Sequence, residues 1–303
     1  MAEKIKLVFL GTSDGVPTKK RNHTSILLNY KEENIMIDCG EGTQRQMRKA
    51  DLNLCKITRI LITHWHADHV LGIPGLLKTL EISGYNKILN IYGPIGTRNK
   101  IENLLSLFKI NPSYEINIHE VSSGKFLDLN EFYLTSEKAK HRISCNAYSF
   151  VLKDKIKINK DKLKKLKIPQ GEFLKNLSKG KDIKYEGKKY KSKNLTYKEK
   201  GKKICFIFDT KKINNLIKLA KDSDLLISEA TFSEEIKERA EEYLHLTGKQ
   251  AGEIAKKSKS KKLLLAHISG RYESDGFKKI LREAKSVFNN TEVVKDLDII
   301  EIK

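Results

Sequence analysis

The sequence has few cysteines and no long apolar run, and these two shortages exclude several classes of protein. Four scattered cysteines, at positions 39, 55, 145 and 205, include no Cys-x-x-Cys pair, so neither a disulfide framework nor a thiolate zinc site is expected. The longest apolar runs, such as residues 263–266, are far too short to cross a bilayer. Residues 1–6 lead into a strand-like stretch and lack the apolar segment of a signal peptide. We therefore expect a cytoplasmic protein without a membrane partner.

Acidic residues are too few to balance the basic ones. The chain has 59 Lys and Arg against 38 Asp and Glu, a net charge of +21. Residues 153–203 contain 20 lysines, 6 acidic residues and no arginine, so they carry 20 − 6 = +14. A solubilising lysine-rich surface would explain the total charge equally well. Its concentration in one segment favours a polyanionic partner, because neutralised phosphates release counterions.

The 303 residues, 39% of them hydrophobic, suffice for one large domain. Outside the basic segment, strand-like runs alternate with helix-like ones. Strands are expected near residues 6–10, 25–30, 34–38, 57–63, 88–92, 114–121, 132–138, 147–152, 204–208, 225–228, 263–266 and 293–302, and helices at 68–83, 96–109, 211–220, 233–243, 248–257 and 276–286. Two strand-rich halves with helices outside predict an α/β fold, a four-layered αββα sandwich over residues 1–303.

Residues 153–200, called the arm below, interrupt this alternation. They are rich in lysine and contain two turn-like points, Pro169-Gln170-Gly171 and Ser178-Lys179-Gly180. Such a stretch is either a disordered insert or a small protruding element. Spaced apolar residues, among them Leu163, Phe173 and Leu177, favour an element with some structure.

The hexad His64-Trp65-His66-Ala67-Asp68-His69 directly follows an apolar run at residues 60–63. A strand that ends there places His64 and His66 on one side, since side chains alternate. Asp68 and His69 fall where the chain turns into the next helix and can point elsewhere. One segment can thus serve two neighbouring cations, and two metals bridged by a carboxylate suit attack of hydroxide on a phosphodiester.

Three further candidate ligands each stand where a buried strand emerges, a position that collects site residues in layered α/β proteins. They are His141, Asp209 and His267. We expect His64, His66 and His141 to hold one metal, and Asp68, His69 and His267 to hold the other, with Asp209 between them. Nitrogen and oxygen ligands without thiolate favour zinc over manganese or iron.

Glu229 follows another buried strand, and His245 stands at a break between two expected helices. Such a pair can pass a proton to a leaving group. From the residues alone, a surface glutamate and a helix-capping histidine are an equal alternative.

Together these residues resemble the ribonuclease Z family of tRNA 3′-processing endonucleases, in the metallo-β-lactamase superfamily. The resemblance covers nearly the whole chain. Its motifs are the hexad, the glycine turn at 10–17, Pro17-Thr18-Lys19-Lys20-Arg21-Asn22, Asp38-Cys39-Gly40-Glu41, Ser228-Glu229-Ala230-Thr231, His245-Leu246-Thr247 and His267-Ile268-Ser269-Gly270-Arg271-Tyr272. Gly171-Glu172 departs from the Gly-Pro that many bacterial relatives have in the arm.

The resemblance implies two Zn²⁺ ions per subunit and a homodimer in which one subunit's basic arm grips the precursor tRNA that the other cuts. It implies Asp68 as proton acceptor and Glu229 with His245 as proton donors to the leaving oxygen. Pro17, Lys19, Arg21 and Asn22 would contact the end of the tRNA, and Arg271 would neutralise phosphate charge. Cleavage is expected just 3′ of the discriminator nucleotide.

Two alternatives keep the same residues. A small-molecule hydrolase such as a thioesterase, lactonase or phosphodiesterase explains the metal ligands but neither the arm nor the 17–22 loop. The other is a non-catalytic RNA-binding protein whose metals are structural, which Asp68→Ala would distinguish.

Overall fold

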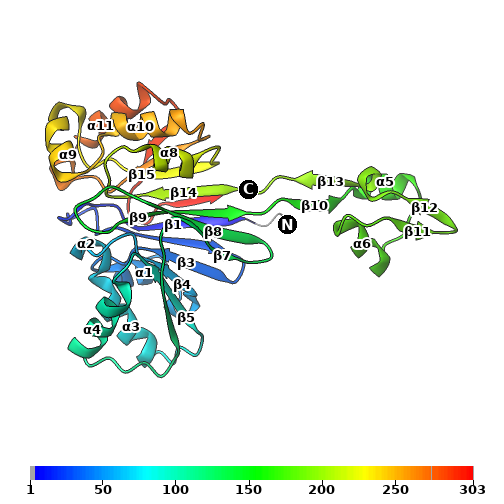
Figure 1. Ribbon diagram of the computed structural model, residues 1–303, viewed down its shortest axis with the longest axis horizontal. Coiled ribbons are helices and arrows are strands. Elements are labelled where there is room, and N and C mark those ends of the chain that lie inside the picture. Colours follow the sequence, from blue (N-terminus) through cyan, green and yellow to red (C-terminus); the bar gives the residue numbers. More distant parts are fainter. Residues whose placement is uncertain (1–3, 274, 303) are drawn as a thin grey trace.

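Two seven-stranded sheets lie face to face in the computed structural model, which describes residues 4–273 and 275–302, and helices cover both outer faces (Figure 1). The first sheet has the order β18-β1-β2-β3-β4-β5-β6, with β1 Ile5–Gly11, β2 Ser25–Tyr30, β3 Glu33–Ile37, β4 Arg59–Leu61, β5 Leu89–Gly93, β6 Ile116–Glu120 and β18 Ile299–Ile302. Its helices are α1 Thr43–Lys49, α2 Ala67–Val70, α3 Gly72–Ile82 and α4 Thr97–Leu107.

The second sheet has the order β17-β16-β15-β14-β9-β8-β7, with β7 Gly124–Asp128, β8 Phe132–Lys138, β9 Asn146–Leu152, β14 Lys203–Ile207, β15 Leu225–Glu229, β16 Leu263–Ala266 and β17 Thr291–Val293. Its helices are α8 Asn214–Ala220, α9 Lys237–Tyr243, α10 Gly248–Lys257 and α11 Phe277–Lys285. The predicted αββα sandwich is confirmed.

Strand alternation divides the apolar residues among three layers of core. In β1, Leu7 and Phe9 face the other sheet, whereas Val8 and Leu10 face the helices. In β14, Phe206 lies between the sheets and Ile207 packs against the outer helices. The central strands of both sheets are therefore buried on both faces, as their near-continuous apolar runs require.

The structure differs from the prediction in several elements, among them strand β7, which was not predicted, and the three described next. Helix α1 was not predicted, because two of its three buried residues, Thr43 and Gln46, are polar and hide its amphipathic pattern. The expected helix 68–83 breaks at Leu71: the Gly72 amide donates to the Cys39 carbonyl instead, and Pro74 suits only a first helical turn. The expected last strand, 293–302, is two strands in different sheets, β17 and β18.

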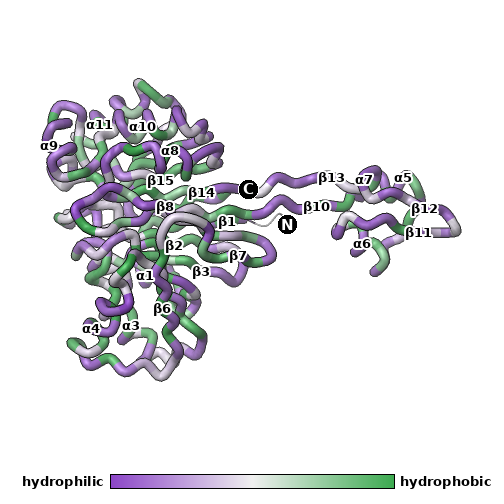
Figure 2. Tube along the Cα trace, in the orientation of Figure 1, coloured by the Kyte–Doolittle hydropathy of each residue, from purple (hydrophilic) through white to green (hydrophobic). Residues whose placement is uncertain are grey.

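The arm consists of a two-stranded stalk and a small tip. The stalk pairs β10 (Lys155–Ile158) with β13 (Thr196–Glu199), and Figure 2 shows it as mostly hydrophilic. The tip contains α5 Lys160–Lys165, α6 Lys175–Ser178, the hairpin of β11 Ile183–Tyr185 and β12 Lys188–Tyr190, and α7 Ser192–Leu195. Its buried apolar cluster is separate from those of the sandwich: Leu163, Ile168, Leu174, Leu177, Ile183 and Leu195. The arm therefore has a core of its own.

The arm joins the sandwich at the end of the sheet that lies opposite the predicted metal ligands. It leaves from β9 at Leu152 and returns to β14 at Lys203, whereas Asp209 lies just beyond the other end of β14. The five residues of β14 span about 16 Å. Figure 1 shows the arm pointing away from the sandwich.

Candidate active site

All seven predicted metal ligands converge at one edge of the sandwich, where strands of both sheets end. They form two clusters that share Asp209. In each cluster, the potential ligand atoms lie within 4.8 Å of one another. One cluster contains His64, His66 and His141; the other contains Asp68, His69 and His267. This grouping is the one expected from the sequence.

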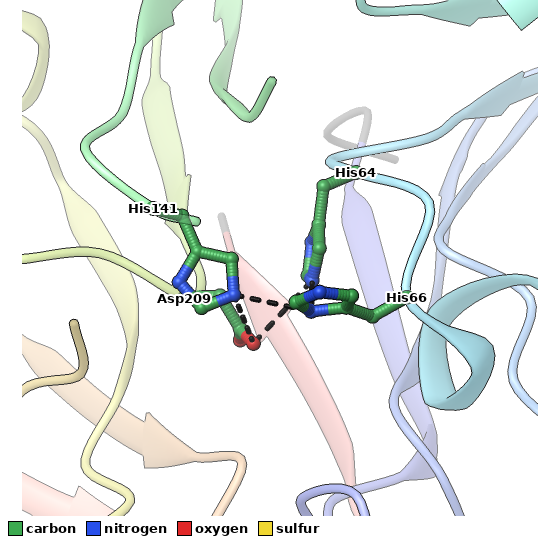
Figure 3. A group of neighbouring side chains, drawn as sticks. All are labelled: His64, His66, His141 and Asp209. Carbon is green, nitrogen blue, oxygen red and sulfur yellow. Dashed lines mark hydrogen bonds and ion pairs between the residues drawn. The ribbon is translucent and has the colours of Figure 1, made fainter. Parts of the chain in front are cut away.

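The three histidines of the first cluster point their ring nitrogens at a common centre (Figure 3). His66 Nδ1 lies 3.0 Å from His64 Nε2 and 3.1 Å from His141 Nε2. Asp209 Oδ2 lies 3.4 Å from His64 Nε2 and 3.8 Å from His141 Nε2. Burial lowers the pKa of all three histidines, which favours the neutral imidazole that binds metals.

The second cluster uses the other oxygen of the same aspartate. Asp209 Oδ1 lies 3.2 Å from His267 Nε2 and 3.5 Å from His69 Nε2, and the two Nε2 atoms are 3.2 Å apart. Asp68 Oδ2 lies 3.3 Å from His69 Nε2 and 3.4 Å from His267 Nε2. Asp209 thus directs one oxygen to each cluster, as a bridging carboxylate does.

These separations fit metal ions. Four ligands about 2.1 Å from a central zinc form a tetrahedron with edges of about 3.4 Å, close to the distances within each cluster. Asp209 Oδ1 is buried and lacks a hydrogen-bond donor among the described residues, so a cation would satisfy it. Asp38, Asp68, Asp209 and Glu229 are all buried here, and two divalent cations would balance their four negative charges.

A second set of residues fixes which ring nitrogen faces the centre in three of the histidines, His69, His141 and His267. His69 Nδ1 donates to Asp38 Oδ2 over 2.7 Å, His267 Nδ1 to Thr231 Oγ1 over 2.9 Å, and His141 Nδ1 to the Leu244 carbonyl over 3.3 Å. Each of these bonds leaves Nε2 free for a metal, and such partners raise the basicity of the ligand.

Asp38 and Thr231 lie in two of the sequence motifs, but no role was predicted for either residue. Asp38 accepts from Thr63 N, Thr63 Oγ1 and His69 Nδ1, each over 2.7 Å. The signal that could have found it is a charged residue directly after the apolar strand β3, beside the strand that precedes the hexad.

Three residues of this site have left-handed backbone conformations. Asp38, Asp209 and His267 follow β3, β14 and β16 within two residues, and their φ angles are 55°, 32° and 52°. Non-glycine residues seldom occupy this region, and strain of this kind gathers at functional sites. The ends of the strands therefore aim these side chains at the centre at a conformational cost.

Glu229 and His245 form the predicted pair beside the second cluster. His245 Nδ1 lies 3.0 Å from Glu229 Oε2, and Glu229 Oε1 accepts from the Thr210 amide over 2.7 Å. Burial opposes a charge on His245, but Glu229 and Asp209 outweigh it and raise its pKa to about 9. A protonated His245 near the cluster can give up a proton.

The loop at residues 17–22 presents only part of its predicted set of RNA contacts. Pro17 and Lys19 are exposed. Arg21, by contrast, is buried, and its guanidinium donates to Thr12 Oγ1 and the Val294 carbonyl. Asn22 Nδ2 donates to the Glu41 carbonyl. Arg21 and Asn22 therefore hold the loop in place, and contact of Pro17, Lys19, Arg21 and Asn22 with tRNA stays a prediction.

Arg271 is exposed next to this loop, as a phosphate contact requires. Its guanidinium stacks over the Phe232 ring, 5.3 Å from the ring centre, and its Nε donates to Ser269 Oγ over 3.3 Å.

Solved structures show which class of protein shares this arrangement. The metallo-β-lactamase-fold protein YhfI from Bacillus subtilis aligns over 99% of this chain and 100% of its own with a TM-score of 0.72 at 18% identity, which shows the fold. Human tRNase Z, short form, aligns over 97% of this chain and 98% of its own with a TM-score of 0.72 at 25% identity. The protein is thus a metallo-β-lactamase-fold protein with a site for divalent metal.

Curated relatives narrow the class. Ribonuclease Z of Listeria welshimeri is 39% identical over 98% of this chain and 99% of its own length. Ribonuclease Z of Methanothermobacter thermautotrophicus is 37% identical over 99% and 97%. The chain belongs to the ribonuclease Z family, and its residues 5–171 also match the family model described as anti-Pycsar protein Apyc1. That match includes the hexad and His141 but ends inside the arm, before Asp209 and His267.

Proposed function

We propose that this protein is a zinc-dependent endoribonuclease that removes the 3′ trailer of precursor tRNA. It cleaves 3′ of the discriminator nucleotide and leaves a 3′-hydroxyl on the tRNA and a 5′-phosphate on the trailer. The observation that carries this proposal is the full-length similarity to ribonuclease Z, which includes the arm as well as the metal cluster.

His64, His66 and His141 would hold one zinc ion, Asp68, His69 and His267 the other, and Asp209 both. When bound, the two ions would lower the pKa of a water and offset phosphate charge. The remaining steps belong to the chain's own side chains.

Asp68 is placed to accept the proton of the attacking water. Among the described residues its hydrogen bonds to His69 and His267 use Oδ2, which leaves Oδ1 for the proton. Protonated His245 donates to the departing 3′-oxygen from Nε2, while the buried carboxylate of Glu229 accepts from Nδ1 and keeps the ring protonated until then.

The arm supplies the grip on tRNA. Its lysines outnumber its acids, and four of the six acids are already engaged in ion pairs, Asp154–Lys198, Glu172–Lys175, Asp182–Lys189 and Glu199–Lys157. Structured RNA is recognised largely through its shape and backbone, which suits such a surface.

A homodimer would bring the arm of one subunit to the site of the other. Within one subunit the arm starts at the far end of β14 from Asp209 and points away (Figure 1), so it does not lie over its own metal centre.

The described residues contain no helix long and apolar enough to span a membrane. Cytoplasmic residence remains our proposal, supported by four cysteines that are all unpaired.

Incubation of the purified protein with a trailer-bearing precursor tRNA, with and without chelator, tests the function once the cut is mapped. Cleavage after the discriminator that chelator abolishes is expected. Deletion of residues 155–198 should abolish pre-tRNA cleavage and retain hydrolysis of bis-p-nitrophenyl phosphate; unchanged pre-tRNA cleavage would contradict the role of the arm. Asp68→Ala that cuts at the wild-type rate would contradict the chemistry.

A further inference from the structure

A basic hollow of about 370 Å³ lies between the 17–22 loop and helix α1. Its walls include Lys19, Lys20, Arg45 and Lys49. We infer that this hollow binds the backbone phosphates of the single-stranded 3′ trailer. This inference rests on the proposed function and adds residues of α1, which the sequence motifs do not contain, to the surface that receives the RNA.

The positive charge of the hollow is poorly compensated. Arg45 and Lys49 are exposed and four residues apart, so they lie on neighbouring turns of one face of α1. Among residues 4–273 and 275–302, no carboxylate oxygen lies within 4.0 Å of the side-chain nitrogens of either. Lys20 is the exception in the wall, because Glu273 and Asp275 are its electrostatic neighbours. Arg45 and Lys49 are therefore available to a phosphate.

The one carboxylate in the wall is turned to internal partners. Asp296 Oδ1 accepts from Thr12 Oγ1, and its Oδ2 accepts from the Asn22 amide over 2.7 Å and from Gln46 Nε2 over 2.9 Å. The buried guanidinium of Arg21 faces the same carboxylate. Asp296 thus organises the floor and does little to repel an anion at the rim.

The hollow is close to the metal centre along the chain. An added side-chain carbon at Gly15 would lie 4.0 Å from Asp68 Oδ2, and the four residues from Gly15 to Lys19 can extend at most about 14 Å. A strand of RNA whose scissile phosphate is at the metals can therefore reach the hollow within a few nucleotides.

The size of the hollow favours the single-stranded trailer over the base-paired acceptor stem. Its volume is that of a small-ligand site, so it accommodates one or two nucleotides and excludes a duplex. On the tRNA side of the cut the chain soon enters the acceptor stem, whereas on the other side it continues as a single strand. Single strands bind basic grooves through their backbone with strong salt dependence.

The test uses Arg45→Gln/Lys49→Gln and two precursor tRNAs, one with a trailer of two nucleotides and one with twelve. The matched control is Arg48→Gln, which removes another exposed arginine of α1, one that lies outside this hollow. For the long trailer we expect KM to rise about tenfold in the double variant, and the slope of log KM against log salt to fall by about 1.4 for two lost contacts. The short trailer should show no such change, and Arg48→Gln neither.

An equal rise in KM for both trailers would overturn the inference, because the contact would then be to the tRNA body. No rise in KM for either trailer would overturn it as well. Filter binding of the same two RNAs in an Asp68→Ala background measures affinity without cleavage. If the wild-type protein fails to cut either RNA, the proposed function fails, while the difference in affinity between the two trailers still decides the role of the hollow.

Discussion

Asp38→Asn should weaken metal binding although Asp38 is not expected to touch a metal. The carboxylate is fully buried and accepts three hydrogen bonds, from Thr63 N, Thr63 Oγ1 and His69 Nδ1. An amide offers one accepting oxygen and places its NH₂ group against at least one of these donors. That donor loses its partner at a cost of about 1–3 kcal/mol. Loss of such a partner behind a ligating histidine lowers metal affinity about 10- to 100-fold.

Metal content after dialysis against graded zinc buffers, together with hydrolysis of bis-p-nitrophenyl phosphate, measures this effect. Asp296→Asn is the control, since Asp296 is half-buried and also accepts three hydrogen bonds, yet lies outside the metal clusters. Only Asp38→Asn should need about 10- to 100-fold more zinc for half occupancy. Equal affinities in the wild type and Asp38→Asn, or an equal loss in both variants, would refute the argument from His69 orientation.

Three further substitutions test other parts of the structure. Glu229→Gln removes the main carboxylate that raises the pKa of His245. Because the protonated ring is the donor, the rate falls as pH rises through that pKa, so the falling limb of the kcat–pH profile should move to lower pH in the variant. A limb that does not move would exclude His245 as the acid. Gly40→Ala places a carbon 2.5 Å from the carbonyl oxygen of Asp68, so it should shift the hexad and cut zinc affinity at least about tenfold; equilibrium dialysis that finds wild-type affinity would contradict this. Leu177→Ala, in the core of the arm, should lower the stability of the arm by about 2–5 kcal/mol, and hydrogen exchange should show lost protection in the arm but not in β14. Lost protection in both would mean that the arm does not unfold separately. Leu166→Ala, at an exposed site of the arm, is the control.

Periodicity predicted those elements whose buried residues are apolar. The αββα layers, helix α10 at residues 248–257 and strand β16 at 263–266 agree with prediction because apolar residues line their buried faces. Helix α1 failed because its buried face contains Thr43 and Gln46, which bond to backbone carbonyls of Gly40 and Leu10. A polar residue buried by a specific partner gives no hydrophobic signal, so its burial follows only from the tertiary structure.

The prediction of a single last strand at residues 293–302 was wrong for a related reason. Residues 291–302 are apolar enough for one strand, yet the chain crosses from one sheet to the other between Val293 and Ile299. The crossing is fixed by Asp296 and by the Val294 carbonyl, whose partners Thr12, Arg21 and Asn22 lie more than 270 residues earlier. Local pattern cannot register such partners.

The candidate site, too, could be predicted only in part. Its seven ligands could be predicted because each histidine or aspartate stands at the end of an apolar strand or in the hexad, and strand ends meet in a layered fold. What could not be predicted is direction: Arg21 and Lys19 lie two residues apart in one loop, yet the first guanidinium turns inward to Thr12 while the second side chain is exposed. Spacing along the chain locates the candidate ligands, whereas the internal partners of each side chain decide which of two neighbouring cations remains exposed.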